Sequence, residues 1–300
     1  MPTHAPALIS SSRRADSTER QVVAAMSDSH GGSALALLNP DTVLADPKNF
    51  DSLQEKPVHL NAFQERLWEW FSDDVARVLA LADGCPLTVL HLGDPTQGTR
   101  FASELVSTRI ADHIIIAADN MGPWFEYPAL KACRMIVGTG VHEFNEATSS
   151  ILVARELKTR FPNVDTRPVY HNLPDIGGRT FDLAHHGAFP GSRNWLRGNV
   201  LRSYVRDIMQ NDIADGKRPP DFVLRGHYHT YVPEVVHERD HETFAAILPS
   251  WCWPTEHARK ATQSVSRVTF GVWAVVLEQG RRPEWTIFKR TIDFRTRETL

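Results

Sequence analysis

The stretch Gly226-His227-Tyr228-His229 directly follows an apolar run, Asp221-Phe222-Val223-Leu224-Arg225, that is typical of a buried β-strand. A glycine at the end of a strand lets the backbone approach a neighbouring group closely. Two histidines one residue apart then offer imidazole nitrogens, which suit zinc, manganese, iron and nickel. Alone, this motif is weak evidence, because the chain has 14 His among 300 residues. Its weight comes from the residues that end the other strands.

Four further strand-like runs end in the same kind of residue. They cover residues 21–26, 86–92, 134–137 and 180–184. The residues that follow them are Asp28-Ser29-His30, Gly93-Asp94, Gly138-Thr139-Gly140-Val141-His142-Glu143 and His185-His186-Gly187. Because ligands bind beyond the carboxyl ends of strands in open α/β sheets, we expect these side chains to converge on one rim. The ordered set, more than any single motif, predicts a metal site rich in Asp and His.

The order of elements predicts an α/β fold. Helices are expected over 62–82, over 100–133 with a break at Gly122-Pro123, over 146–160 and over 196–214. The chain after residue 230 is mostly β, with strands expected over 231–237, 242–248, 266–278 and 284–293. Such βα units followed by a β-rich half favour two packed mixed β-sheets flanked by helices, a four-layer αββα arrangement. We expect residues 1–19 to form a flexible tail and residues 20–300 a single domain.

Composition and charge narrow the classes of function. Lys plus Arg number 33 and Asp plus Glu number 36, so the net charge is −3. A general nucleic-acid coat carries a basic excess, so any contact with nucleic acid has to be local or metal-mediated. Cys85, Cys133 and Cys252 form no CxxC pair, which argues against a disulfide framework and a cysteine zinc site. No apolar run approaches the about 18 residues of a membrane span. The apolar segment that a secretory signal carries after its basic residues does not follow Arg13-Arg14. A cytoplasmic protein without membrane contact is therefore expected.

The ordered motifs resemble those of the calcineurin-like metallophosphoesterase superfamily. That family carries, in order, DxH, GD, GNH followed by an acid, a single His, and GHxH. The matching segments are Asp28 to His30, Gly93-Asp94, Gly138 to Glu143, His185, and Gly226 to His229. The likeness spans residues 20–235, and the later strands fit the family's second sheet. The GTxxH form in place of GNH is most similar to the phosphoesterases carried by phages and prophages.

The resemblance implies two divalent transition-metal ions (Mn, Fe, Ni or Zn) and hydrolysis of phosphoester bonds. It implies that Asp28, His30 and His229 hold the first metal and that His185 and His227 hold the second. Asp94 is expected to bridge the two metals. His142 is expected to act on the scissile phosphate without binding metal. A pair of such metals stabilises the leaving group of a phosphoester and lowers the pKa of a bound water. The expected substrate is a phosphorylated small molecule or a nucleic acid, either a monoester or a diester.

One departure from the family concerns the second metal, because the Asn of Gly-Asn-His is missing. Thr139, Asn120 and Asn145 are candidates for its place, with Thr139 favoured as a weak ligand. A hydroxyl is a weaker donor than an amide carbonyl, so the second metal is expected to leave first. Gln97 is interpreted as a support for the ligands. His186 is interpreted as a supporting or structural residue in preference to a ligand.

Residues 187–195 form a predicted loop directly after a predicted ligand. Arg193 could bind a phosphate, and Trp195 could stack on a base or ring. A solvated loop with one packed Trp explains the same residues equally well.

Two other classes of function remain open from the sequence. One is a metal- and nucleic-acid-binding phage accessory protein with little turnover, which the net charge of −3 and the presence of His142 disfavour. The other is a His-rich metallohydrolase with an amidohydrolase-like barrel. Such a barrel carries HxH on its first strand, whereas here DxH comes first and HxH comes late.

Overall fold

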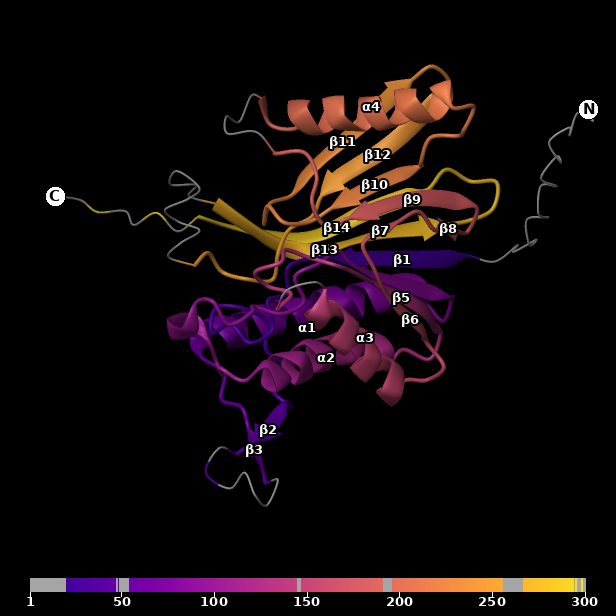
Figure 1. Cartoon of the computed structure of the whole chain (residues 1–300). Helices are drawn as coiled ribbons and strands as arrows, with labels where there is room; N and C mark the ends of the chain where they lie inside the picture. Colours follow the sequence, from indigo (N-terminus) through magenta and orange to yellow (C-terminus); the bar gives the residue numbers. More distant parts are fainter. Residues whose placement is uncertain are drawn as a thin grey trace, which may run out of the picture.

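The computed structural model describes residues 20–46, 48, 54–144, 147–190, 196–255, 267–293, 295 and 298. Within these ranges two mixed β-sheets lie face to face (Figure 1). The first sheet contains, in spatial order, β14 (Glu284–Asp293), β13 (Arg267–Leu277), β1 (Gln21–Met26), β4 (Leu87–His91), β5 (Leu130–Ile136) and β6 (Asp165–Val169). The second contains β11 (Val232–Glu238), β12 (His241–Ile247), β10 (Phe222–Arg225), β9 (Arg179–Ala184) and β7 (His171–Asn172), and β8 (Asp175–Ile176) pairs with β9.

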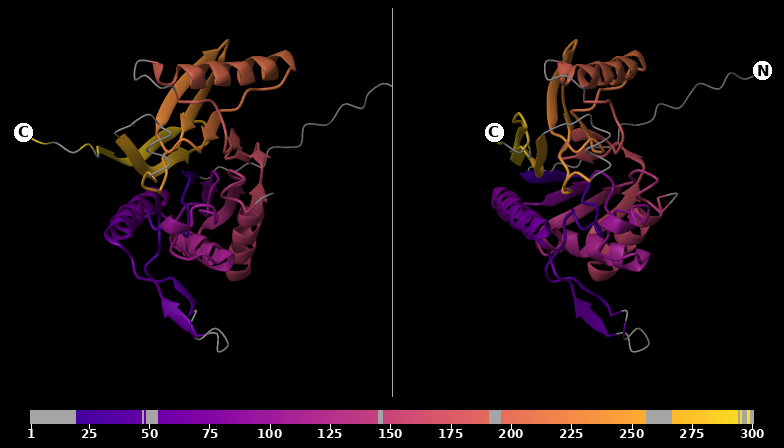
Figure 2. Two further views of the ribbon diagram at one scale, coloured as in Figure 1. Left: turned by 60° about the vertical axis from the view of Figure 1, so that its left-hand side comes forward. Right: turned by 90° about the vertical axis from the view of Figure 1, so that its left-hand side faces the viewer.

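Helices cover the outer faces of both sheets. α1 (Ala62–Ala82), α2 (Ile110–Phe125) and α3 (Thr148–Arg160) lie on the side of the first sheet, and α4 (Asn199–Ala214) lies on the second (Figure 2). A hairpin of β2 (Val43–Ala45) and β3 (Glu55–Pro57) projects beyond α1 and α2. The predicted four-layer αββα arrangement is therefore confirmed. In the part of the chain that the structure describes, no helix combines the length and the hydropathy needed to cross a bilayer.

Alternation along the strands explains why both faces of the sheets are buried. In β1, Val22 and Ala24 join the core under α1–α3, whereas Val23 and Ala25 join the core between the sheets. Successive side chains leave a strand on opposite faces, so one strand serves two cores. A third buried cluster lies between α4 and the second sheet. Strands buried on both faces read as continuous apolar runs, which made them visible in the sequence.

The region between β4 and β5 differs from the prediction. The helix expected over 100–133 is confined to α2, preceded by a short 3-10 turn, and β5 already begins at Leu130. The break expected at Gly122-Pro123 is wrong, because α2 continues through the proline. A proline cannot donate to the carbonyl four residues earlier. Asn39 instead donates its Nδ2 to that carbonyl of Asp119 at 2.9 Å, which satisfies the oxygen.

Several short strands were not predicted. β6 lies at the edge of the first sheet and contains Pro168, which removes a backbone donor and is tolerated at such an edge. β2, β3, β7 and β8 are two or three residues long and mostly polar. Such segments carry too little apolar periodicity to be told from loops. That residues 20–300 form a single domain stays a prediction.

The direction of the strands sets the place of the site. β1, β4 and β5 pair in parallel in the first sheet, and β9 and β10 pair in parallel in the second. Parallel neighbours end at the same edge of a sheet. The residues that follow β1, β4, β5, β9 and β10 are therefore brought to one side of the sandwich, as expected for ligand sites in α/β folds.

A buried ion pair that joins α1 to β14 predicts a pH effect on stability. Asp74 Oδ1 accepts from Arg290 Nη1 at 2.7 Å, and Asp74 Oδ2 finds no hydrogen-bond partner among the described residues. Burial raises the pKa of Asp74 from 3.8 to about 6 in spite of Arg290. The folded chain thus holds this proton more tightly than the unfolded chain. We expect the contribution of Asp74 to stability to fall as pH rises from about 4 to about 6, by at most about 3 kcal/mol.

The measurement is urea unfolding of the wild type and of Asp74→Asn at pH 4.5 and pH 7.5. The variant cannot ionise, so its stability relative to the wild type should improve at the higher pH. Asp41→Asn, which changes an exposed carboxylate, serves as the control. A stability difference between wild type and Asp74→Asn that is the same at both pH values contradicts the expectation.

Candidate metal centre

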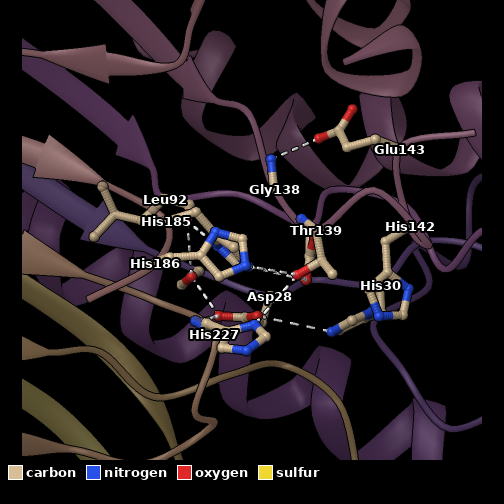
Figure 3. A network of polar contacts seen from close by, with 12 residues as sticks. Asp28, His30, Leu92, Gly138, Thr139, His142, Glu143, His185, His186 and His227 are labelled. Carbon is tan, nitrogen blue, oxygen red and sulfur yellow. Dashed lines mark hydrogen bonds and ion pairs between the residues drawn. The ribbon is translucent and has the colours of Figure 1, made fainter. Parts of the chain in front are cut away.

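Side chains from five strand ends meet at one edge of the sandwich (Figure 3). Asp28 and His30 follow β1, Asp94 follows β4, Thr139 and His142 follow β5, His185 and His186 follow β9, and His227 and His229 follow β10. Their ligand atoms form groups in which all members lie within 4.8 Å of one another: Asp28–His30–His229, His30–Asp94–His142, Asp28–Asp94–His185 and His185–His186–His227. The convergence predicted from the sequence is confirmed.

The two-sheet sandwich and the order of these segments along the chain agree with the resemblance found in the sequence. The segments DxH, GD, GTxxH, HHG and GHxH follow β1, β4, β5, β9 and β10 in turn, and all reach the same edge. The chain resembles the calcineurin-like metallophosphoesterases in this arrangement. The Asp and His clusters lie where the parallel strands of the two sheets end.

Similarity to known proteins is found at the level of structure. No family model matches the sequence, and no curated protein matches it. Among solved structures, NAD nucleotidase from Haemophilus influenzae is 11% identical with a TM-score of 0.37, over 89% of this chain and 49% of that one. A predicted phosphoesterase from Streptococcus pneumoniae is 13% identical (TM-score 0.30, 90% and 98% covered), and Vps29 from Chaetomium thermophilum is 12% identical (0.28, 93% and 97%). The chain thus spans about half of the length of the nucleotidase.

The backbone beneath the site is strained. Asp28, His30, Asp94, His227 and His229 all have positive φ, from 43° at His30 to 73° at His227. Residues other than glycine rarely adopt this conformation. Each instance costs of order 1–3 kcal/mol, and such residues cluster at functional sites. The five donors are therefore held in place at a cost in local stability, as is typical of functional sites.

Glycines next to the donors leave room for them. A Cβ built on Gly93 collides with the His185 imidazole, and one built on Gly138 collides with the Asp94 carboxylate. Gly140, two residues further on, has nothing within 4 Å of its Cβ position. Gly93 and Gly138 are therefore points of close approach between the backbone and donor side chains, and the sequence-based interpretation that glycine lets backbone and metal approach stays a prediction.

This difference gives a matched pair of variants. Gly138→Ala should push the Asp94 carboxylate out of the site and lower the bound metal by at least tenfold at a fixed metal concentration, the scale of edits next to ligands. Gly140→Ala should leave metal binding unchanged. Equilibrium dialysis against Mn²⁺ or Zn²⁺, with metal counted by mass spectrometry, measures both. Equal metal contents for the two variants would contradict the expectation that metal binding requires the close contact between Gly138 and the Asp94 carboxylate.

The first donor group surrounds an unsatisfied carboxylate oxygen. Asp28 Oδ2 accepts from the His227 backbone N–H at 3.0 Å and from the Ser27 hydroxyl. Asp28 Oδ1 is buried and makes no hydrogen bond within the described residues, although His229 Nε2 lies 3.3 Å away. His229 Nε2 also faces His30 Nε2 at 3.1 Å. A carboxylate oxygen and two imidazole nitrogens directed at one point fit a divalent cation, which satisfies all three.

The second donor group surrounds the Thr139 hydroxyl. Its Oγ1 lies 3.2 Å from Asp94 Oδ2, 3.2 Å from His185 Nε2, 3.2 Å from His227 Nδ1 and 3.5 Å from His186 Nε2. The Thr139 backbone N–H donates to Asp94 Oδ1 at 2.6 Å and so orients the carboxylate. These contacts place Thr139 inside the site, where the sequence analysis expected a weak ligand.

Both carboxylates are held in the ionised form. Burial alone raises the pKa of Asp28 and Asp94. The surrounding imidazoles outweigh it, with His229 acting most strongly on Asp28 and His185 on Asp94, and they hold both pKa values below the usual range. Ionised carboxylates are the form that a metal requires.

The imidazoles divide into two kinds. Burial lowers the pKa of His30 and lowers that of His227 to about 4, helped by neighbouring histidines, so both rings are neutral near pH 7. Burial opposes protonation of His185 as well, but the Asp94 carboxylate raises the pKa of His185 to about 9. His185 donates its Nδ1–H to the Leu92 carbonyl at 2.6 Å, so the Nε2 proton is the one that faces Asp94. A cation entering here has to displace that proton.

His142 stands beside both donor groups. Its Nδ1–H donates to the Gln97 carbonyl at 2.6 Å, and its own carbonyl accepts from Thr96 Oγ1 at 2.7 Å. This leaves Nε2 for other partners, because the hydrogen bond of one ring nitrogen sets the tautomer. The ring meets that of His30 edge-on at a centroid distance of 4.5 Å. His142 also lines a pocket together with the residues His30, Asp94, Gln97, Phe101, His227, His229, Cys252, Trp253 and Thr255.

The loop that carries Thr139 and His142 is tied down by Glu143. This buried carboxylate accepts from the Gly138 backbone N–H at 2.8 Å, from Ser149 Oγ at 2.7 Å and from the Ser150 backbone N–H at 2.9 Å. It thereby joins the end of β5 to the first turn of α3. Carboxylates are favourable at the N-terminus of a helix, so the loop is anchored firmly.

Some residues proposed from the sequence do not reach the site. Asn120 was expected as a possible replacement ligand, and this is wrong: it is buried in α2, where its Oδ1 accepts from the Asn39 N–H and its Nδ2 donates to the Leu37 carbonyl, both at 2.8 Å. The other proposed residues, Asn145, Arg193 and Trp195, lie outside the described residues. His186, interpreted from the sequence as a supporting or structural residue, lies in one group with His185 and His227.

Proposed function

We propose that the chain hydrolyses phosphoester bonds at a dinuclear metal centre. The observation that carries this proposal is that carboxylates link two donor groups. Asp94 lies with His30 and His142 on one side and with Asp28 and His185 on the other. Two metals sharing a carboxylate suit an in-line attack on a phosphoryl group, because the attacking and the leaving oxygen both need stabilisation.

The residues present fit two transition metals. Asp28, His30, His229 and Asp94 would hold the first, and His185, His227 and Asp94 the second, with the Thr139 hydroxyl as a weak ligand. Mixed imidazole and carboxylate donors favour Mn, Fe, Ni or Zn over Mg or Ca. When bound, such a pair supplies Lewis-acid polarisation of the phosphoryl group and a water of lowered pKa.

The chain itself supplies the proton for the leaving group. His142 is anchored through Nδ1 to the Gln97 carbonyl, so its Nε2 can carry a proton toward the pocket that it lines. Protonation of a leaving oxygen by a positioned imidazole is ordinary general acid catalysis. Loss of that proton leaves a neutral ring, which the next proton from solvent can recharge.

The pocket favours a substrate with an organic group. Phe101 and Trp253 line the same pocket as His142 and His30. Trp253 is fixed by packing against Phe270 at a ring-centroid distance of 4.8 Å. Aromatic rings beside a phosphate-binding site suit a flat apolar leaving group, such as an aryl alcohol or a nucleoside. We therefore propose phosphorylated small molecules or nucleotides as the substrate class.

The test is a screen of the metal-free chain, reloaded with Mn, Ni, Zn or Mg, on an aryl phosphate and on a bis-aryl phosphate. We expect the rate of hydrolysis to depend on added metal and to be higher with a transition metal than with Mg. The rate should vary little with salt concentration. A chain that binds two metals but hydrolyses neither ester would contradict the proposal. It would favour a metal-binding protein with little turnover.

A further inference from the structure

We propose that His186 is a direct ligand of the second metal and takes the place of the Asn that this chain lacks. The inference rests on the proposed dinuclear function. His186 follows His185 at the end of β9, so its backbone is placed by the same strand. Among the described residues, His185, His186 and His227 offer nitrogens that all lie within 4.8 Å of one another.

The orientation of the His186 ring supports a ligand. Although the residue is exposed, its Nε2 turns inward to 3.5 Å from the Thr139 hydroxyl (Figure 3). Its ring lies 4.6 Å from the ring of His227 and 4.8 Å from that of His185, measured between centroids. A solvated surface histidine has no reason to direct a nitrogen at two other imidazoles. A shared cation gives that reason, because it replaces repulsion between lone pairs with three bonds.

The spacing of the donors agrees with one coordination shell. At metal–nitrogen distances of about 2.0–2.1 Å, neighbouring donors in tetrahedral or octahedral shells lie roughly 2.8–3.4 Å apart. Thr139 Oγ1 has Asp94 Oδ2, His185 Nε2 and His227 Nδ1 at 3.2 Å, and His186 Nε2 at 3.5 Å. The first three separations match neighbouring ligands of one ion, and His186 Nε2 lies just outside that range.

This assignment changes the expected affinities. Three imidazoles and a carboxylate give the second site four protein ligands besides the weak Thr139 hydroxyl, so its strong ligands number as many as those of the first. The sequence analysis expected the second metal to leave first. With His186 bound, we expect the two binding steps to be comparable in the wild type and to separate only when His186 is replaced.

The experiment is a calorimetric titration of metal-free protein with Zn²⁺ or Mn²⁺, supported by Co²⁺ absorption spectra. His186→Ala should weaken one of the two steps by roughly 10–100-fold, leave the other unchanged, and alter the Co²⁺ spectrum. His186→Leu should give the same result, since its side chain offers no ligand atom. His237→Ala, at an exposed histidine of β11, is the control and should change nothing. Thr139→Asn added to His186→Ala should recover part of the lost affinity by restoring an amide oxygen.

The outcomes separate the inference from the function on which it rests. His227→Ala should lose the second step whether or not His186 binds metal. Two steps in the wild type, one in His227→Ala and two unchanged steps in His186→Ala and His186→Leu would overturn the role of His186 alone. A wild type that never binds a second metal would overturn the dinuclear proposal and the role of His186 with it.

Discussion

Replacing Asp94 by Asn should abolish phosphoester hydrolysis and lower the metal content at the same time. Asp94 Oδ2 lies 3.1 Å from His185 Nε2, and the residue groups with His30 on the other side. An amide keeps the shape but removes the negative charge between two proposed cations. We expect the rate to fall by at least about 10³-fold, because loss of one metal removes the electrostatic stabilisation of the transition state.

The number of bound metals per chain should be measured together with the rate of hydrolysis. The variant should retain one metal per chain or fewer, while Asp240→Asn, at an exposed turn between β11 and β12, should retain two and full activity. Asp28 also lies between the donor groups, but its Oδ2 is occupied by the His227 N–H. An Asp94→Asn protein that keeps both metals and most of its rate would refute the dinuclear assignment.

Replacing His142 by Ala should lower kcat by roughly 10²–10⁴-fold, the usual contribution of a positioned acid or base. The proposed role is protonation of the leaving oxygen by Nε2, with Nδ1 fixed on the Gln97 carbonyl. The loss should be large for an alkyl leaving group and small for nitrophenolate, which leaves without a proton. Rates for a series of leaving groups measure this dependence.

Metal content separates this role from ligation. His142 lies in one group with His30 and Asp94, so a ligand role is geometrically open to it. We expect His142→Ala to bind both metals as the wild type does, with His59→Ala as the exposed control. Equal rate losses for good and poor leaving groups would refute proton donation, and loss of a metal would make His142 a ligand.

The fold could be predicted where local pattern and burial agree. The central strands of the two sheets, such as β1, β4 and β10, are largely buried on both faces, so their runs are visible without knowledge of their neighbours. The course of α2 through Pro123 could not be predicted. It depends on Asn39, which lies far away in sequence and satisfies the carbonyl of Asp119. The edge strand β6 was hidden for the same reason, because its pairing with β5 is a tertiary contact.

The site shows the same division. The donors after β1, β4, β9 and β10 were identified because each directly follows an apolar run, and the resemblance assigned them roles. The position of Asn120 was predicted wrongly, because the packing of α2 decides where this side chain points. The orientation of the His186 ring, whose Nε2 lies 3.5 Å from the Thr139 hydroxyl, is not recorded by any motif. The likeness to phage-borne enzymes stays a prediction.

The sequence by itself determined which donors the chain offers and at which strand ends, because alternation, glycine and the following Asp or His are local features. Only the tertiary structure decided which donors face one another. His30 and His229 are 199 residues apart in sequence, yet their Nε2 atoms lie at 3.1 Å. That distance follows from the parallel pairing of strands within each sheet and from the packing of the two sheets against each other. Coordination requires positions accurate to a few tenths of an ångström, and such accuracy comes from the packed core beneath the strand ends.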